Sequence, residues 1–104
     1  MKKALFSVVF GLFVTGTAIA DQADLALATS KNCMSCHAVE RKVLGPSFKD
    51  VAAKYKDDKG AVDMLATKIK KGGSGVWGPV PMPANTQVSD SDARKLAAWV
   101  LSAK

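Results

Sequence analysis

The chain has 104 residues, which is enough for one small domain with a modest core. Its 15 basic residues outnumber its 9 acidic ones, and the formal net charge is +6 with histidine neutral. The basic residues form no arginine-rich block and have few aromatic neighbours. The charge therefore argues against nucleic acid as a ligand and favours an acidic protein partner.

The first twenty residues have the pattern of a secretory signal peptide. Met1-Lys2-Lys3 is a short basic region, an apolar run of 13 residues follows, and Ala18-Ile19-Ala20 has the small-x-small pattern of a cleavage site. The apolar run is shorter than the roughly 20 residues of a membrane-spanning helix, so an uncleaved anchor is the less favoured alternative. We expect cleavage after Ala20, which leaves one domain (21–104) of 84 residues with a net charge of +4.

A short alanine-rich helix is expected at about 24–30. It leads into Cys33-Met34-Ser35-Cys36-His37, which contains both cysteines and the only histidine. The pattern Cys-x-x-Cys-His is typical of a c-type haem attachment site. Two thiols on one helical turn can each add across a vinyl group of the same porphyrin, and the next residue can turn its imidazole onto the iron. We therefore predict that Cys33 and Cys36 attach the haem and that His37 is the proximal ligand.

Two other kinds of site contain a Cys-x-x-Cys pair. A structural zinc site needs about four Cys or His ligands. This chain has three, and Cys36 and His37 are adjacent and poorly placed to share a tetrahedral ion. A thioredoxin-like redox site would be accompanied by βαβ patterning, which the sequence lacks. Covalent haem is the favoured interpretation, and a redox-active disulfide between Cys33 and Cys36 is the alternative.

The rest of the chain shows helical periodicity and almost no alternation of apolar and polar residues. A turn is expected at 43–47, where a glycine precedes a proline. Apolar residues then recur at i, i+3, i+4 and i+7 in two segments, which predicts two amphipathic helices. Their apolar stripes are Phe48, Val51, Ala52 and Tyr55 in the first and Val62, Leu65, Ala66 and Ile69 in the second.

The second of these helices is expected to stop at Gly72-Gly73, because glycine adopts a positive φ at a helix end at little cost. A last helix is predicted after Ser89, which together with Asp90 and Asp92 offers an N-cap and early acidic residues. Its apolar residues are Ala93, Leu96, Ala97, Trp99 and Val100. With the helix at 24–30, these patterns predict an all-α domain of about four short helices.

The long irregular segment 72–88 is expected to be functional, because loops of this length are unusual in so small a domain. Within it, Met82 lies between two prolines. Prolines fix φ and stiffen a segment, so this loop can hold a weak ligand in place.

Met82 is the methionine best suited to be the second axial ligand. Met34 lies inside the attachment motif, and Met64 is expected to be largely solvent-facing, opposite the apolar stripe of its helix. Met82 follows His37 by 45 residues, which is ample chain to pass around the haem edge. His/Met ligation is the cytochrome c pattern, and the alternative is a methionine of the core or of a turn.

These residues resemble those of a known family. The chain is similar to the short bacterial class I cytochromes c of the c-551 and c-552 type, over essentially all of 21–104. The resemblance is specific in 33–37, in 43–47, in 75–82 and around Trp99. It implies the haem-wrapped all-α cytochrome c fold with crossing first and last helices, one haem c bound through two thioethers, and a location in the periplasm.

The resemblance implies roles for three further residues. The carbonyl group of Pro46 would accept a hydrogen bond from the free ring nitrogen of His37 and make the imidazole a better donor. The indole N–H of Trp77 would donate to a haem propionate, and Asn85 would donate to the sulfur of Met82. Without the family, the Pro46 segment is only a turn, Trp77 is equally a core aromatic, and Asn85 is equally a turn residue.

The chain departs from the family pattern at two positions. Lys68 stands where some relatives have a propionate-binding arginine, so a point charge replaces a bidentate contact. Ala84 stands where relatives often have a second proline after the methionine, and the loop should therefore be somewhat less rigid.

The ligand count favours electron transfer over catalysis. If His37 and Met82 fill both axial positions, no coordination site remains for oxygen, peroxide or substrate. We therefore expect a monomeric electron carrier, not an enzyme, that works between respiratory-chain donors and a terminal reductase or oxidase. Redox partners of this kind include a nitrite reductase, a terminal oxidase, a peroxidase or a bc1-type complex. The alternatives are a small haem peroxidase or gas-binding sensor in which Met82 dissociates, and a haem-free thiol oxidoreductase.

Positive charge near the haem is expected to guide the redox partner. In the family the haem is buried except for a strip along one edge. Lys42 follows the attachment motif, and Lys70 and Lys71 precede the long loop, so all three could border this strip. The alternative is that they are ordinary solvated lysines.

Overall fold

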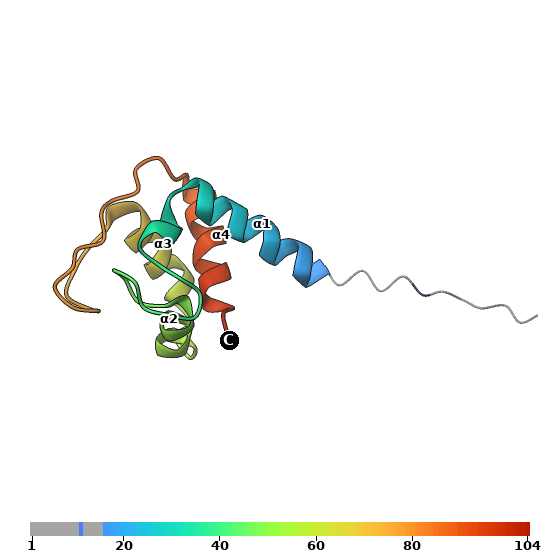
Figure 1. Cartoon of the computed structure of the whole chain (residues 1–104), viewed down its shortest axis with the longest axis horizontal. Coiled ribbons are helices and arrows are strands. Elements are labelled where there is room, and N and C mark those ends of the chain that lie inside the picture. The colour runs from blue at the N-terminus through green and yellow to red at the C-terminus, as the bar shows by residue number, and fades with distance from the viewer. Residues whose placement is uncertain (1–10, 12–15) are drawn as a thin grey trace, which may run out of the picture.

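The structure is a computed structural model that describes residue 11 and residues 16–104. The described part contains four α-helices and one short 3-10 helix: α1 (Gly16–Ser30), η1 (Cys33–Ser35), α2 (Phe48–Tyr55), α3 (Ala61–Lys71) and α4 (Asp90–Leu101). Within the described ranges no strand forms, and α4 contacts each of the other three α-helices (Figure 1). The prediction of an all-α domain with about four helices is confirmed.

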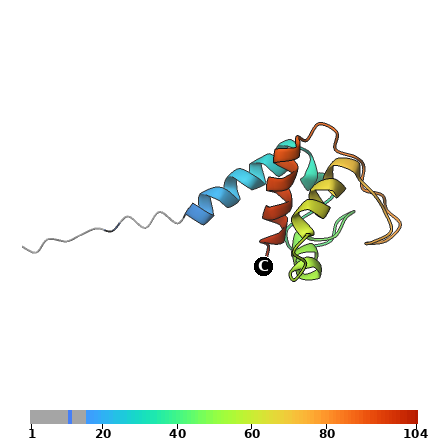
Figure 2. The same cartoon turned by 180° about the vertical axis from the view of Figure 1, so that it is seen from behind.

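Helix α1 is longer than the sequence pattern predicted. It begins at Gly16 and not near residue 24, in keeping with the strong helix propensity of its many alanines. Its C-terminal part packs on α4 through the buried Ala28, while its N-terminal part extends away from the other helices (Figure 2). The expected cleavage point after Ala20 lies inside this helix, and most of the predicted signal peptide (1–10 and 12–15) lies outside the described residues.

Helix α2 begins where a side chain caps it. The hydroxyl group of Ser47 accepts a hydrogen bond from the backbone N–H of Asp50 at 3.1 Å, which satisfies one of the free donors of the first turn. The predicted stripe is buried at Phe48, Val51 and Ala52. This stripe turns α2 toward α4.

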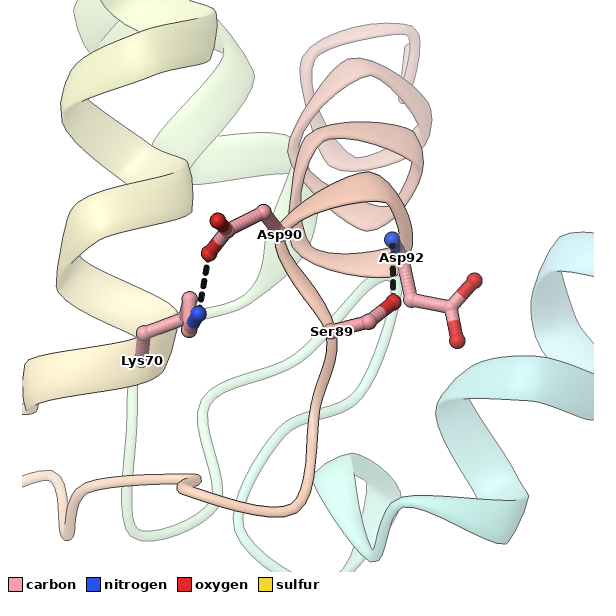
Figure 3. Close-up of polar contacts among 4 residues, drawn as sticks. All are labelled: Lys70, Ser89, Asp90 and Asp92. Atoms are coloured by element: carbon pink, nitrogen blue, oxygen red, sulfur yellow. Dashed lines mark hydrogen bonds and ion pairs between the residues drawn. The ribbon is translucent and has the colours of Figure 1, made fainter.

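Helices α3 and α4 form an antiparallel pair joined by the long loop. Helix α3 ends at Gly72, whose φ of 71° is the left-handed value expected there. Helix α4 begins after Ser89, whose hydroxyl group accepts from the backbone N–H of Asp92 at 3.1 Å (Figure 3). Both predicted helix ends are confirmed.

The core between the helices is built mainly from small side chains. Its buried cluster consists of Ala28, Ala66, Val88, Ala93, Leu96 and Ala97. Alanines let α3 and α4 approach closely, but they bury little apolar surface. Most of the large apolar side chains lie elsewhere, around a cavity.

None of the helices in the described ranges combines the length and apolar character that a membrane crossing requires.

Candidate haem-binding site

One cavity brings together residues from η1, α2, α3, α4 and the long loop. Its wall includes all eight residues that the sequence predicted for the site: Cys33, Cys36, His37, Pro46, Lys68, Trp77, Met82 and Asn85. Large apolar side chains provide much of the remaining wall: Leu44, Phe48, Val51, Met64, Leu65, Ile69, Val76, Val80 and Trp99. The cavity therefore has a mostly apolar lining that also contains sulfur and nitrogen donors.

The tight turn of η1 brings the two thiols to the cavity. The backbone N–H groups of Cys36 and His37 both donate to the carbonyl oxygen of Cys33, at 3.2 and 3.1 Å. The preceding residue, Asn32, adopts a left-handed φ of 64°, which turns the chain out of α1 and into this turn. As a result, the two cysteines and the histidine of the motif lie in one wall.

The thiols of Cys33 and Cys36 are free. Partial burial raises the pKa of the Cys33 thiol, and the nearby Cys36 adds to this effect while a backbone hydrogen bond opposes it. A thiol oxidoreductase needs the opposite, because its attacking cysteine has a lowered pKa that favours the thiolate. The environment of Cys33 thus does not favour its thiolate.

The ring of His37 is held on two sides. It stacks on Phe48 with a centroid distance of 5.1 Å and an interplanar angle of 25°. On another side lies Gly45, where an added Cβ would come within 2.5 Å of the ring atom Cε1. Only glycine leaves room for the ring in this position.

A hydrogen bond then selects the ring nitrogen that can bind a ligand. Nδ1 of His37 lies 2.8 Å from the carbonyl oxygen of Pro46. A carbonyl oxygen can only accept, so Nδ1 carries the hydrogen of the neutral imidazole and Nε2 keeps its lone pair. Among the described residues Nε2 has no hydrogen-bond partner. This is the arrangement of a histidine that is prepared to bind a metal.

Met82 is fixed at its backbone to the end of α3. Its N–H donates to the carbonyl oxygen of Gly73 at 2.8 Å, and the N–H of Gly73 donates back to Met82 at 3.0 Å. Gly72 passes so close to Met82 that an added Cβ would collide with the Met82 carbonyl group. The two glycines that end α3 therefore also place the methionine.

Asn85 ties the second half of the loop to α3. Its backbone N–H and its side-chain amide both donate to the carbonyl oxygen of Ile69, at 3.1 and 3.0 Å. The same amide lies 3.4 Å from the carbonyl oxygen of Pro83. In the described contacts the amide is thus engaged with backbone oxygens, and a bond from Asn85 to the sulfur of Met82 stays a prediction.

Met64 does not lie where the sequence pattern placed it. It is half-buried and lines the cavity, so the expectation of a largely solvent-facing side chain is wrong. The cause is that α3 has two buried sides: Ala66 packs against α4, while Met64 and Lys68, one turn apart, face the cavity. The single apolar stripe predicted for this helix therefore described only part of its buried surface.

Two lysines lie at or near the cavity wall, Lys54 beside aromatic rings and Lys68 within the lining. Nζ of Lys54 is 5.7 Å from the ring centroids of both Tyr55 and Trp77, within the range of cation–π attraction. The Lys68 side chain lies over Gly73, where an added Cβ would come within 2.6 Å of Nζ. These cations and the indole N–H of Trp77 suit a ligand with carboxylate groups.

Several of these contacts had no clear signal in the sequence. Gly45 looked like part of a turn and Phe48 like one member of an apolar stripe, while Lys54 was not singled out. Their proximity to His37 and Trp77 depends on how α2 packs. The adjacent glycine and proline at 45–46 were the one usable signal, because glycine permits a close approach.

The cavity fits a covalently bound haem. It offers an apolar wall for the porphyrin, two free thiols for the vinyl groups, one imidazole with a free lone pair, and the thioethers of Met64 and Met82. It also explains the small core, since the large apolar side chains surround this space and would have a common partner in the haem.

Comparisons with known proteins agree with this arrangement. Residues 23–104 match the model of the family Cytochrome c. The chain is 56% identical over 93 residues to cytochrome c-552 of Nitrosomonas europaea, covering 89% of this chain and 87% of the relative. It is 52% identical over 104 residues to cytochrome c-552 of Hydrogenobacter thermophilus, covering all of both chains.

The crystal structure of Nitrosomonas europaea cytochrome c552 superposes with a TM-score of 0.75 at 56% identity, covering 77% of this chain and 99% of the other. With the residues of the cavity, these matches settle the family. The chain belongs to the cytochrome c family and is a small class I c-type cytochrome, an electron carrier with one covalently bound haem c.

Proposed function

We propose that this cytochrome carries single electrons in the periplasm with His37 and Met82 as the axial ligands of its iron. The observation that carries the proposal is that the free Nε2 of His37 belongs to the same cavity wall as Met82 and both thiols. Bound haem supplies the one-electron chemistry, since its iron changes between the ferric and ferrous states.

The surrounding residues would adjust this chemistry. The bond from Nδ1 to the carbonyl group of Pro46 raises the basicity of Nε2 on the His37 ring. A thioether from Met82 favours the ferrous state and raises the reduction potential. Lys68 and Trp77 would hold haem carboxylates, because both line the cavity and offer N–H donors.

If His37 and Met82 both bind the iron, no coordination site would remain for a substrate, which favours a carrier over a peroxidase or a gas sensor. Tethering at Cys33 and Cys36 keeps the cofactor in place through many redox cycles. The backbone bonds between Met82 and Gly73 support the same conclusion, because they limit the movement of the sixth ligand.

The redox partner would dock where the cavity opens. Leu44, Val76 and Val80 line the cavity and are more than half exposed, with exposures of 58%, 53% and 57%. This apolar rim suits a brief contact that brings a partner close to the haem edge. Exposed Lys42 and Lys71 would add steering by charge, as in docking to an acidic surface of a reductase, an oxidase or a bc1-type complex.

Lys70 is less suited to steering than the sequence pattern indicated. Its ammonium group pairs with Asp90, which neutralises much of its field. The steering proposal therefore rests on Lys42 and Lys71.

The protein would be exported to the periplasm by its signal peptide, which would be cleaved after Ala20. The basic start, the apolar run and the small-x-small pattern support this.

One optical spectrum of the purified protein tests the proposed ligation. A low-spin spectrum with a sharp α-band in the reduced state is expected for two strong axial ligands. A high-spin spectrum would instead indicate an open coordination site and an enzyme or a sensor, and a missing α-band would indicate a haem-free thiol protein.

A further inference from the structure

The loop that carries Met82 is held at its base by three connections, two to residues of α3 and one to Gly73 just after it. The innermost is the pair of backbone bonds between Gly73 and Met82. The second is the double contact of Asn85 with the carbonyl oxygen of Ile69. The outermost is an ion pair between side chains, Lys70 to Asp90.

The ion pair joins the two residues at which the loop leaves one helix and enters the next. Lys70 lies in the last turn of α3, and Asp90 is the first residue of α4 (Figure 3). Nζ of Lys70 donates to Oδ1 of Asp90. The position of Asp90 is favourable for a second reason, since a carboxylate at a helix N-terminus interacts well with the helix dipole. The neighbouring cap at Ser89 fixes the backbone from which Asp90 projects.

The loop has few other restraints. Between its two ends, the described backbone bonds within it include a turn from Gly75 to Gly78 and a bond from Val88 to Asn85. Pro81 and Pro83 stiffen the chain directly beside Met82, but Ala84 adds no further proline after them. Withdrawal of Met82 from the cavity requires the loop to lift from α3, and a link across its base opposes this movement.

We propose that Lys70 and Asp90 are positioning residues for Met82: their ion pair closes the base of the ligand loop and lowers the fraction of molecules in which the methionine has left the iron. The inference rests on the proposed His37/Met82 ligation. It concerns the opening of the loop and not the overall stability of the helix pair.

The same two helices contain a matched control. Asp63 in the first turn of α3 pairs with Arg94 of α4. This pair also joins exposed side chains, but it lies one turn along α4 from Asp90 and two turns along α3 from Lys70. Loss of this pair should loosen the helices without releasing the base of the loop.

The experiment is a spectroscopic titration of the oxidised holoprotein with imidazole, which binds only when the sixth position opens. Because apparent affinity scales with the fraction of open molecules, Lys70→Gln and Asp90→Asn should bind imidazole more tightly than the natural protein. We expect a gain of about two- to five-fold, the scale of an exposed ion pair. Asp63→Asn and Arg94→Gln should leave the affinity unchanged.

The imidazole affinity can also be measured at high salt and in a variant in which the two charges are exchanged. At about 1 M salt the Debye length falls to roughly 3 Å, so the natural protein should approach the affinity of Lys70→Gln. The double variant Lys70→Asp with Asp90→Lys should recover part of the natural affinity at low salt.

Equal imidazole affinity in Lys70→Gln and the natural protein at low salt would overturn the inference. So would an equal gain in the Asp63→Asn control, because the effect would then come from general loosening. Met82→Leu separates this failure from that of the ligation itself. If imidazole binds no more tightly to Met82→Leu than to the natural protein, the methionine is not the sixth ligand and both proposals fall.

Discussion

Nδ1 of His37 lies 2.8 Å from the carbonyl oxygen of Pro46, and this contact decides which nitrogen of the only imidazole in the chain is free to bind iron. The contact depends on Gly45, which passes beside the ring, and on Phe48, which stacks against it. A glycine, a proline and an aromatic residue within four positions thus orient His37, the proposed proximal ligand.

Gly45→Ala should displace the His37 ring. The new Cβ would lie 2.5 Å from Cε1 and 2.9 Å from Nδ1, so the ring or the backbone must move. We expect a loss of stability of about 1–3 kcal/mol, as for other overpacked sites. Chemical denaturation of the holoprotein measures it.

Gly60→Ala is the matched control. There the nearest atom to an added Cβ is Oδ1 of Asp58 at 3.5 Å, an ordinary contact, and the φ of −91° suits any residue. Its stability should stay within about 0.5 kcal/mol of the natural value. An equal loss in both variants would show that the close approach to His37 has no special cost.

Replacement of both cysteines should remove haem from the denatured chain. Thioether bonds survive unfolding, so the natural protein should keep its haem in a denaturing gel, whereas Cys33→Ala with Cys36→Ala should not. Haem-specific staining reads this directly. The same variant should fold poorly in circular dichroism, because the large apolar side chains surround the cavity and the core is mostly alanine. If haem remains attached to the double variant, Cys33 and Cys36 are not the residues that attach it.

The ion pair between Lys70 and Asp90 should make the stability of the protein depend on pH. The bond from Lys70 and its charge lower the pKa of the Asp90 carboxyl group below its usual value. A group with a lowered folded-state pKa stabilises the fold above its unfolded pKa, which is about 3.9, and loses this contribution as pH falls through the folded-state value. Asp90→Asn should therefore be less stable than the natural protein at pH 7, with a difference that shrinks below about pH 4. A difference that is constant down to pH 2 would mean that the charge of Asp90 has no role.

Partner steering can be tested by charge reversal at the two exposed lysines proposed to guide the partner. Lys42→Glu and Lys71→Glu should slow electron transfer with an acidic partner at low ionic strength, and Lys104→Glu serves as the remote control. The effect should fade as the Debye length shrinks from roughly 30 Å at 0.01 M to 10 Å at 0.1 M salt. Stopped-flow rates measure it. Equal rates in all three variants would indicate docking through the apolar rim at Leu44 and Val80 alone.

Much of this site could be predicted because its chemistry is local in the sequence. The cysteine spacing, the adjacent His37 and the proline-flanked Met82 each carry a chemical meaning that does not depend on the fold. The helix ends at Gly72 and Ser89 were predictable for the same reason, since caps act through neighbouring residues.

The contacts that could not be predicted are those that arise between elements. Periodicity showed that α3 is amphipathic but not that Met64 would face a second neighbour, the cavity. Lys70 looked like a free surface charge, because its partner Asp90 lies 20 residues away across the loop. The early start of α1 shows a different limit, since helix propensity can extend a helix beyond the part that packs.

The most direct test of the account compares Met82→Leu with Met64→Leu. Both methionines line the same cavity, and leucine preserves most of the apolar volume while it removes the sulfur. We predict that Met82→Leu changes the iron from low-spin to a form that binds imidazole or cyanide readily and lowers the reduction potential, because thioether ligation favours the ferrous state. Met64→Leu should leave both the spectrum and the ligand affinity unchanged. An unchanged low-spin spectrum in Met82→Leu would remove the methionine from the coordination sphere and contradict the account.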